Sequence, residues 1–116
     1  MENNNLTIIR NRLSQTYSGT TNVPTIYHPI DVLTNNEIIV VTELHKWAEG
    51  IGLLYAHSTQ FPNRTKHLHI YNTHILPRVE PVVPAVQQIV NPLNNLLLNK
   101  IIILVNQLNI TLSVEE

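Results

Sequence analysis

The feature that most constrains this chain is a β-branched run that gives way at once to a helical pattern. Residues 37–42 read Glu-Ile-Ile-Val-Val-Thr, which is typical of a strand buried on both faces. Over residues 44–58 the apolar side chains recur at helical spacing and form one stripe. A buried strand followed directly by an amphipathic helix predicts an α/β fold, in which helices pack on a sheet.

Periodicity and turn residues predict further elements on both sides of this pair. Asn35 and Asn36 form a two-residue turn of hairpin type just before the buried strand. Gly50 and Gly52, inside the predicted helix, indicate a close approach of that helix to the sheet. The other predictions are helices at 6–17, 80–91 and 93–108, strands at 25–27, 30–34, 66–71 and 109–114, and a turn at 20–24.

The length predicts a single domain, because 116 residues can build one core but not two. Residues 1–5 form a polar tail. Prolines punctuate an expected insertion at residues 75–95. The order of elements predicts a small mixed sheet flanked by helices.

The composition narrows the classes of partner. Charged residues make up 13% of the chain, about half the usual share, so some apolar surface is expected to be covered by a partner or a second copy. The net charge of −1 gives no general basic footprint for nucleic acid. With no cysteine, disulfides and thiolate zinc sites are excluded.

The most apolar segment, residues 96–108, is interrupted by polar side chains and is shorter than the roughly 20 apolar residues of a membrane span. We therefore expect no membrane association and a protein that is soluble and intracellular, or a virion component. The segment is nevertheless apolar around most of a helix, which is more than one core-facing stripe requires. The surplus predicts a subunit interface and a homo-oligomer.

The run from Asp31 to Thr42 resembles the motif of small PD-(D/E)XK nuclease-like proteins of large DNA viruses and phages. The resemblance continues through Trp47 and Ile51-Gly52 to the segment at residues 61–71, and resumes near Lys100. It implies a restriction-endonuclease-like fold and an ancestral Mg²⁺-dependent hydrolysis of DNA.

The catalytic pattern that the resemblance implies is mostly missing. Asp31 stands at the family's metal-binding aspartate, but the metal-binding glutamate falls on Val40 and the lysine on Thr42. A single carboxylate does not suffice for a catalytic Mg²⁺. We therefore expect no catalytic residues and no cofactor; if a metal binds, Asp31 is the expected ligand, and local turn hydrogen bonds are the other explanation for that residue.

Two further groups of residues offer alternative sites. If the protein is active with Mg²⁺, the catalytic residues are expected to be Asp31 together with Glu43 and Lys46, which begin the helix. In a regular strand Glu43 points away from the face of residue 40, so this site requires the strand to end early.

A modest basic cluster predicts where nucleic acid would bind, and comprises Arg64, Lys66, His67 and His69. His67 and His69 also share a strand face of the kind that metal ions use, with His45, His57 and His74 as other potential ligands. We expect the pair to be ordinary strand histidines, either hydrogen-bonded or exposed, in preference to metal ligands.

The function expected from the sequence is that of a catalytically inactive, nuclease-fold binding or assembly module that forms a homo-oligomer. Two alternatives remain open: a Mg²⁺-dependent DNA endonuclease with a rearranged site, and a non-catalytic nucleic-acid-binding protein.

Overall fold

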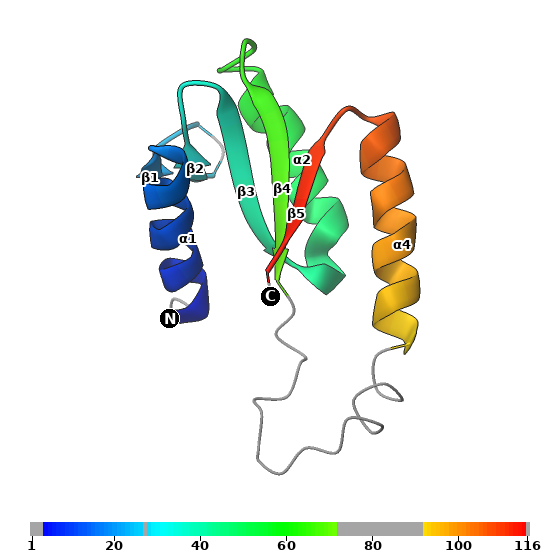
Figure 1. Cartoon of the computed structure of the whole chain (residues 1–116). Coiled ribbons are helices and arrows are strands. Elements are labelled where there is room, and N and C mark those ends of the chain that lie inside the picture. Colours follow the sequence, from blue (N-terminus) through cyan, green and yellow to red (C-terminus); the bar gives the residue numbers. More distant parts are fainter. Residues whose placement is uncertain (1–3, 27, 72–91, 116) are drawn as a thin grey trace.

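The computed structural model describes residues 4–26, 28–71 and 92–115, which form a five-stranded mixed sheet flanked by helices (Figure 1). This arrangement confirms the predicted fold class. The elements in chain order are α1 (Asn4–Tyr17), β1 (Thr20–Val23), β2 (Ile30–Leu33), β3 (Glu37–Glu43), the 3₁₀ turn η1 (Leu44–Lys46), α2 (Trp47–Ser58), β4 (Thr65–Tyr71), α4 (Pro92–Gln107) and β5 (Thr111–Val114).

The strands lie in sequence order across the sheet, β1-β2-β3-β4-β5. The first three form an antiparallel meander, whereas β4 is parallel to β3 and β5 is parallel to β4. The predicted turn at residues 35–36 joins β2 to β3, and the Thr34 amide donates to the Glu37 carbonyl oxygen at 3.0 Å. The predictions that Val40 and Thr42 lie on the strand after the one containing Asp31, and that the Trp47 helix packs on the sheet, are therefore confirmed.

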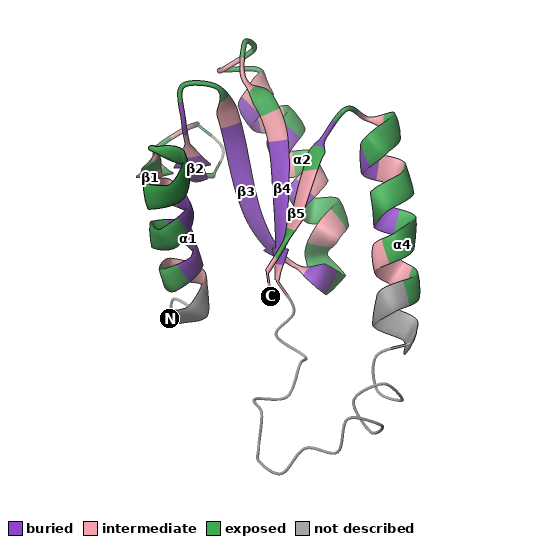
Figure 2. Cartoon of the chain, in the orientation of Figure 1, coloured by how far each residue is buried: buried purple, intermediate pink, exposed green. Residues whose placement is uncertain are grey.

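Each face of β3 packs against a different helix layer, which explains its unbroken β-branched sequence. Ile39 and Val41 join Ile9 and Leu13 of α1 in one cluster. Ile38 and Val40 face a larger cluster, to which α2, β4 and α4 contribute Leu54, Leu68, Ile101 and others. The middle of β3 and of β4 is buried throughout (Figure 2).

The helix α2 approaches the sheet most closely at Gly50. A Cβ atom placed there would lie 2.8 Å from Leu68 Cδ1 and 3.0 Å from Thr42 Cγ2, both tighter than normal contact. A Cβ atom at Gly52 would meet nothing within 4 Å. The predicted role in close approach is therefore confirmed for Gly50 and wrong for Gly52.

The helix α4 carries apolar side chains on two faces. Ile101 and Val105 are buried in the larger core cluster. Leu96, Ile102 and Ile103 instead keep 55%, 45% and 56% of their surface exposed. The described helices include none long and apolar enough to cross a membrane.

Two stretches differ from their sequence predictions. Residues 4 and 5, predicted as the end of a polar tail, are the first residues of α1. Residues 20–23, predicted as a turn, form the edge strand β1, and residues 25 and 26 of the predicted strand at 25–27 are not in a strand. The reason is tertiary: β2 offers an antiparallel partner, and Thr20 pairs with Leu33 while Val23 pairs with Ile30. The predicted helix at 80–91 and most of the expected insertion lie outside the described residues, and residues 92–95 belong to α4.

Candidate functional site

The sheet opens at one end, where β2 and β3 separate. The two strands pair only at Val32 with Ile39 and at Leu33 with Ile38. Beyond that point the Asp31 side chain replaces the backbone of β2 as the hydrogen-bond acceptor, and its Oδ2 accepts a hydrogen bond from the Val41 amide at 2.7 Å. A carboxylate thus occupies the position of a neighbouring backbone and holds the strands apart.

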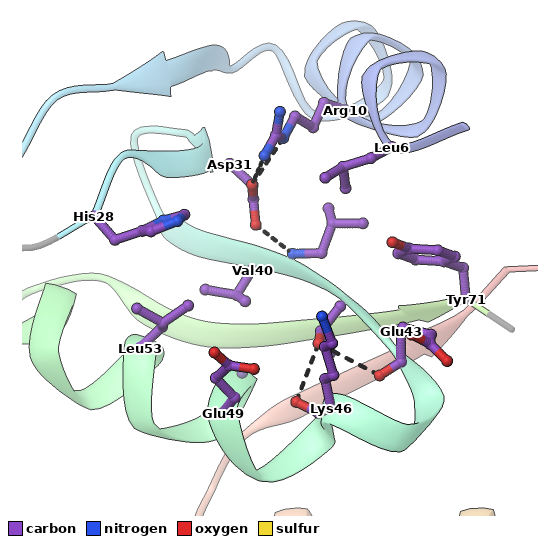
Figure 3. A pocket seen from close by; sticks show the side chains of 13 residues that line it. Leu6, Arg10, His28, Asp31, Val40, Glu43, Lys46, Glu49, Leu53 and Tyr71 are labelled. Carbon is purple, nitrogen blue, oxygen red and sulfur yellow. Dashed lines mark hydrogen bonds and ion pairs between the residues drawn. The ribbon is translucent and has the colours of Figure 1, made fainter. Parts of the chain in front are cut away.

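A cavity of about 210 Å³ lies at this opening, between α1, β2, β3 and the start of α2 (Figure 3). Its walls carry opposite charges in close proximity. The charged side chains that line it are Arg10, Asp31, Glu43, Lys46 and Glu49. The structure therefore brings Asp31, Glu43 and Lys46 to one cavity, as the alternative site in the sequence requires, although β3 continues to Glu43 instead of ending early.

Asp31 is held on both of its oxygens. Arg10 lies beside it, and its Nε donates to Oδ1 at 2.7 Å, with Nη2 also 2.7 Å from that oxygen (Figure 3). The second oxygen accepts from the Val41 amide. Both side chains of the ion pair are buried, so the carboxylate has its charge and its lone pairs matched inside the protein.

The residues at this cavity do not fit a Mg²⁺ site. Mg²⁺ requires near-octahedral oxygen ligands, with one or two carboxylates bound directly. Asp31, the expected ligand, would have to exchange Arg10 and the Val41 amide for the ion. Within the described residues, no group of three or more His, Cys, Asp or Glu side chains is placed to hold a metal ion.

Thr42, where the PD-(D/E)XK pattern has its lysine, has a structural role. Its hydroxyl donates to the Lys46 carbonyl oxygen at 3.1 Å. This bond closes η1 and fixes the turn from which the exposed Lys46 side chain extends along the cavity. The Thr42 hydroxyl thus stabilises the turn that leads into α2.

The predicted basic cluster is divided by the strand pleat. Arg64 packs over the Phe61 ring at 4.9 Å and donates from Nε to the Thr34 carbonyl oxygen at 3.1 Å. The Lys66 ammonium lies 4.9 Å from the centre of the Tyr55 ring. His67 and His69 lie on the opposite face of β4 and are buried, so the four residues do not form one surface.

His67 and His69 belong to a polar network that was not predicted from the sequence. The network joins β3, β4, β5 and α1 through Glu37, Ser113, Glu115 and Arg12. The alternation of His67 and His69 was visible in the sequence. Their partners were not, because all four come from segments distant in the chain.

His57 is buried in a different way. It is fully enclosed on α2, and neither ring nitrogen has a hydrogen-bond partner among the described residues. Burial lowers the pKa of His57, because the enclosed site disfavours the charged ring. The neutral imidazole therefore behaves as a core side chain. The other predicted histidine ligand, His45, is exposed in η1, and His74 lies outside the described residues.

Comparison with known proteins finds two relatives, both from Acanthamoeba polyphaga mimivirus. One is named as a KilA-N domain-containing protein and is 36% identical over 64 residues, which are 55% of this chain and 26% of the relative. The other, also named as a KilA-N domain-containing protein, is 29% identical over 70 residues, which are 60% of this chain and 20% of the relative. The chain thus spans about a quarter or less of the relatives it matches. No family model matches it, and no solved structure does.

These relatives overturn the resemblance to PD-(D/E)XK nucleases. Both are named for a KilA-N domain, which belongs to a different fold family from those nucleases. The prediction that the chain has viral relatives is confirmed. The misleading signal was a run of strand residues after a single aspartate, and the role of that aspartate in this structure is to pair with Arg10.

Proposed function

We propose that this chain is a non-catalytic binding and assembly module that self-associates through the outer face of α4. The observation that carries the proposal is the second apolar face of that helix. Ile101 and Val105 already fill the core side, yet Leu96, Ile102 and Ile103 lie on the exposed side. Apolar side chains gathered on one helix face favour association over exposure to water.

The same face has the character expected of a contact between identical copies. Leu96 and Ile103 are seven residues apart, so they lie on one side of the helix two turns from each other. Lys100 is the single charged residue of α4 and lies one turn from both Leu96 and Ile103, so its long side chain would have to reach water at the edge of the contact. Two antiparallel copies of α4 would bring Leu96 of one copy against Ile103 of the other, which is the reciprocal contact of a two-fold interface.

The cavity supports a role without catalysis. Asp31 is committed to Arg10 and to the Val41 amide, and the Thr42 hydroxyl is committed to the turn before α2. A carboxylate or hydroxyl that bound a metal ion or transferred a proton would have to exchange such partners. Here those exchanges would break the buried Arg10–Asp31 ion pair and the hydrogen bond that closes the turn before α2.

Sedimentation of the full chain over a range of concentrations tests the proposal. We expect a dimer at tens of micromolar, in the range of ordinary weak-dimer affinities. Ile103→Glu should yield a folded monomer, whereas Gln15→Glu, at an exposed position of α1 on the other side of the sheet, should remain dimeric. A parent protein that stays monomeric at these concentrations would refute the proposal. Circular dichroism of each variant separates dissociation from unfolding.

A second candidate, a Mg²⁺-dependent DNA endonuclease, rests on one observation, that Asp31, Glu43 and Lys46 line the same cavity. It would require Asp31 to exchange Arg10 and the Val41 amide for the ion. Incubation with supercoiled and branched DNA in Mg²⁺ and in Mn²⁺ tests it. Lys46→Met is the informative variant, because Lys46 is exposed and its loss should leave the fold intact. Cleavage by the parent that disappears in this variant would support the enzyme. Salt-sensitive DNA retention without cleavage, weakened by Lys66→Gln, would favour a nucleic-acid-binding protein.

A further inference from the structure

Two histidines of β4 point at one hydroxyl group of β5. Ser113 Oγ lies 2.7 Å from Nε2 of His67 and 2.6 Å from Nδ1 of His69. Both rings are buried, with 2% and 5% of their surface exposed. They lie on the sheet face that packs against α1, because His67 and His69 pair with Ile39 and Val41 across β3. The proposed function does not use this group.

Glutamate side chains determine the proton on the outer nitrogen of each ring. Glu37 Oε2 lies 3.0 Å from Nδ1 of His67, and Glu115 Oε1 lies 2.8 Å from Nε2 of His69. An ionised carboxylate can only accept, so each of these nitrogens must carry a hydrogen. Glu115 is kept ionised because Arg12 binds both of its oxygens and lowers the pKa of that carboxyl.

The inner nitrogens, which face Ser113, cannot both be satisfied if the two rings are neutral. If both rings were neutral, Nε2 of His67 and Nδ1 of His69 would each present a lone pair to Ser113 Oγ. The hydroxyl has one hydrogen and can satisfy one of them. The remaining contact would set a nitrogen lone pair against an oxygen lone pair at hydrogen-bond distance, inside the protein, where an unmade polar contact is costly.

We infer that His67 and His69 share one additional proton and form, with Ser113, a proton-dependent clasp that holds β5 to β4. In this arrangement His69 is the imidazolium and donates from Nδ1 to Ser113 Oγ, which donates in turn to Nε2 of His67. All four ring nitrogens and the Ser113 hydroxyl hydrogen then have a partner.

His67 is the ring that stays neutral. Burial lowers its pKa, and this outweighs the nearby Glu37 carboxylate, which acts in the opposite direction. Tyr17 of α1 also closes over it, with the two rings edge to face at a centroid distance of 5.7 Å. The charged groups around the pair are Glu37 of β3, Arg12 of α1 and Glu115, which follows β5.

The clasp makes the attachment of β5 depend on pH. The shared proton belongs to the folded arrangement, so the stabilisation is present at lower pH and is lost as the pH rises and the proton leaves. Without that proton, the lone pair of one inner nitrogen and a lone pair of Ser113 Oγ would repel each other and push Ser113 away from β4. Because β5 follows α4 in the chain, its release would also loosen the end of that helix.

Nitrogen-15 spectra of the imidazole rings in the full chain test the inference. At neutral pH we expect both nitrogens of His69 to be protonated and His67 to carry its hydrogen on Nδ1. Two neutral rings at this pH would overturn the clasp. As the pH rises and the clasp loses its proton, the amide exchange of β5, corrected for intrinsic rates, should accelerate.

Two substitutions at Ser113 separate the clasp from a simple ion pair between His69 and Glu115. Ser113→Thr keeps the hydroxyl and should keep the imidazolium. Ser113→Ala removes the hydroxyl, so both inner nitrogens can stay unprotonated. We then expect two neutral rings at neutral pH and a corrected β5 exchange that no longer depends on pH. An imidazolium that persists in Ser113→Ala would show that the hydroxyl does not require the proton, and the inference would fall.

Discussion

Arg10 of α1 and Asp31 of β2 form a buried ion pair, with two guanidinium nitrogens each 2.7 Å from the same carboxylate oxygen. Their side chains keep 11% and 8% of their surface exposed. The pair fastens the first helix to the sheet at the point where β2 and β3 separate. Asp31, which the sequence suggests as a metal ligand, therefore supports the fold.

Breaking this pair should destabilise the protein strongly. Asp31→Ala leaves the Arg10 charge buried and removes the acceptor of the Val41 amide, so we expect a loss of about 3–5 kcal/mol in the free energy of unfolding. Urea unfolding measures the loss. Glu49→Ala removes an exposed carboxylate from the same cavity and should change stability by no more than about 0.5 kcal/mol. Equal effects of the two substitutions would contradict a structural role for Asp31.

The two glycines of α2 should respond to alanine in opposite directions. Gly52→Ala adds a methyl group in open space and should stabilise the helix by about 1 kcal/mol. Gly50→Ala drives a methyl group into Leu68 and Thr42, and the strain of about 1–3 kcal/mol should exceed the same helical gain. Thermal unfolding of both variants checks the pair. A stabilised Gly50→Ala would show that α2 can move away from the sheet.

Replacing His57 by leucine should stabilise the protein. The imidazole is fully buried with both nitrogens lacking partners among the described residues, and an apolar side chain of similar size removes that penalty of about 1–3 kcal/mol. Because the pKa of His57 is lowered by burial, the parent should also lose stability as the pH falls below about 6.5, the ordinary value for the unfolded chain. Denaturation at pH 7.5 and 5.5 should show a smaller difference for His57→Leu than for the parent.

Glu115 should contribute to stability only above the pH at which it takes up a proton. Its pKa is lowered, first by the hydrogen bonds from Arg12 and then by His69. A lowered pKa in the folded state gives a contribution that is present above the unfolded value, about 4.3, and is lost as the pH falls below it. Arg12→Gln removes the main cause, so its acid unfolding should begin at higher pH. Lys100→Gln, at an exposed position of α4, is the control and should leave the pH of acid unfolding unchanged.

The sequence was most informative where local pattern and tertiary packing agree. The run at residues 37–42 needed no further information, since β-branched residues on both faces suit a strand between two helix layers. The change to helical spacing likewise located α2, although its first residues form the 3₁₀ turn η1. The prediction of a turn at residues 20–23 was wrong because Thr-Thr-Asn-Val becomes a strand only when β2 lies beside it.

The candidate site was harder to predict because its chemistry depends on partners from distant segments. Asp31 reads as a metal ligand when only its strand is considered, and as a structural anion once Arg10 is placed beside it. His67 and His69 read as surface residues until Tyr17, Glu37 and Ser113 are seen to enclose them. Sequence spacing locates a side chain on its own strand, but its protonation and its partners are set across the sheet.

The parallel pairing of β5 with β4 has a consequence for the order in which the chain folds. The meander of β1, β2 and β3 joins neighbouring segments, whereas Leu68 and Leu112 must find each other across a long intervening stretch. Closing such a loop costs entropy before any contact repays it, so this pairing is expected to form late. We therefore expect the N-terminal strands to form the folding nucleus and β5 to dock after the rate-limiting barrier. Substitutions in β5 would then accelerate unfolding while leaving the folding rate nearly unchanged.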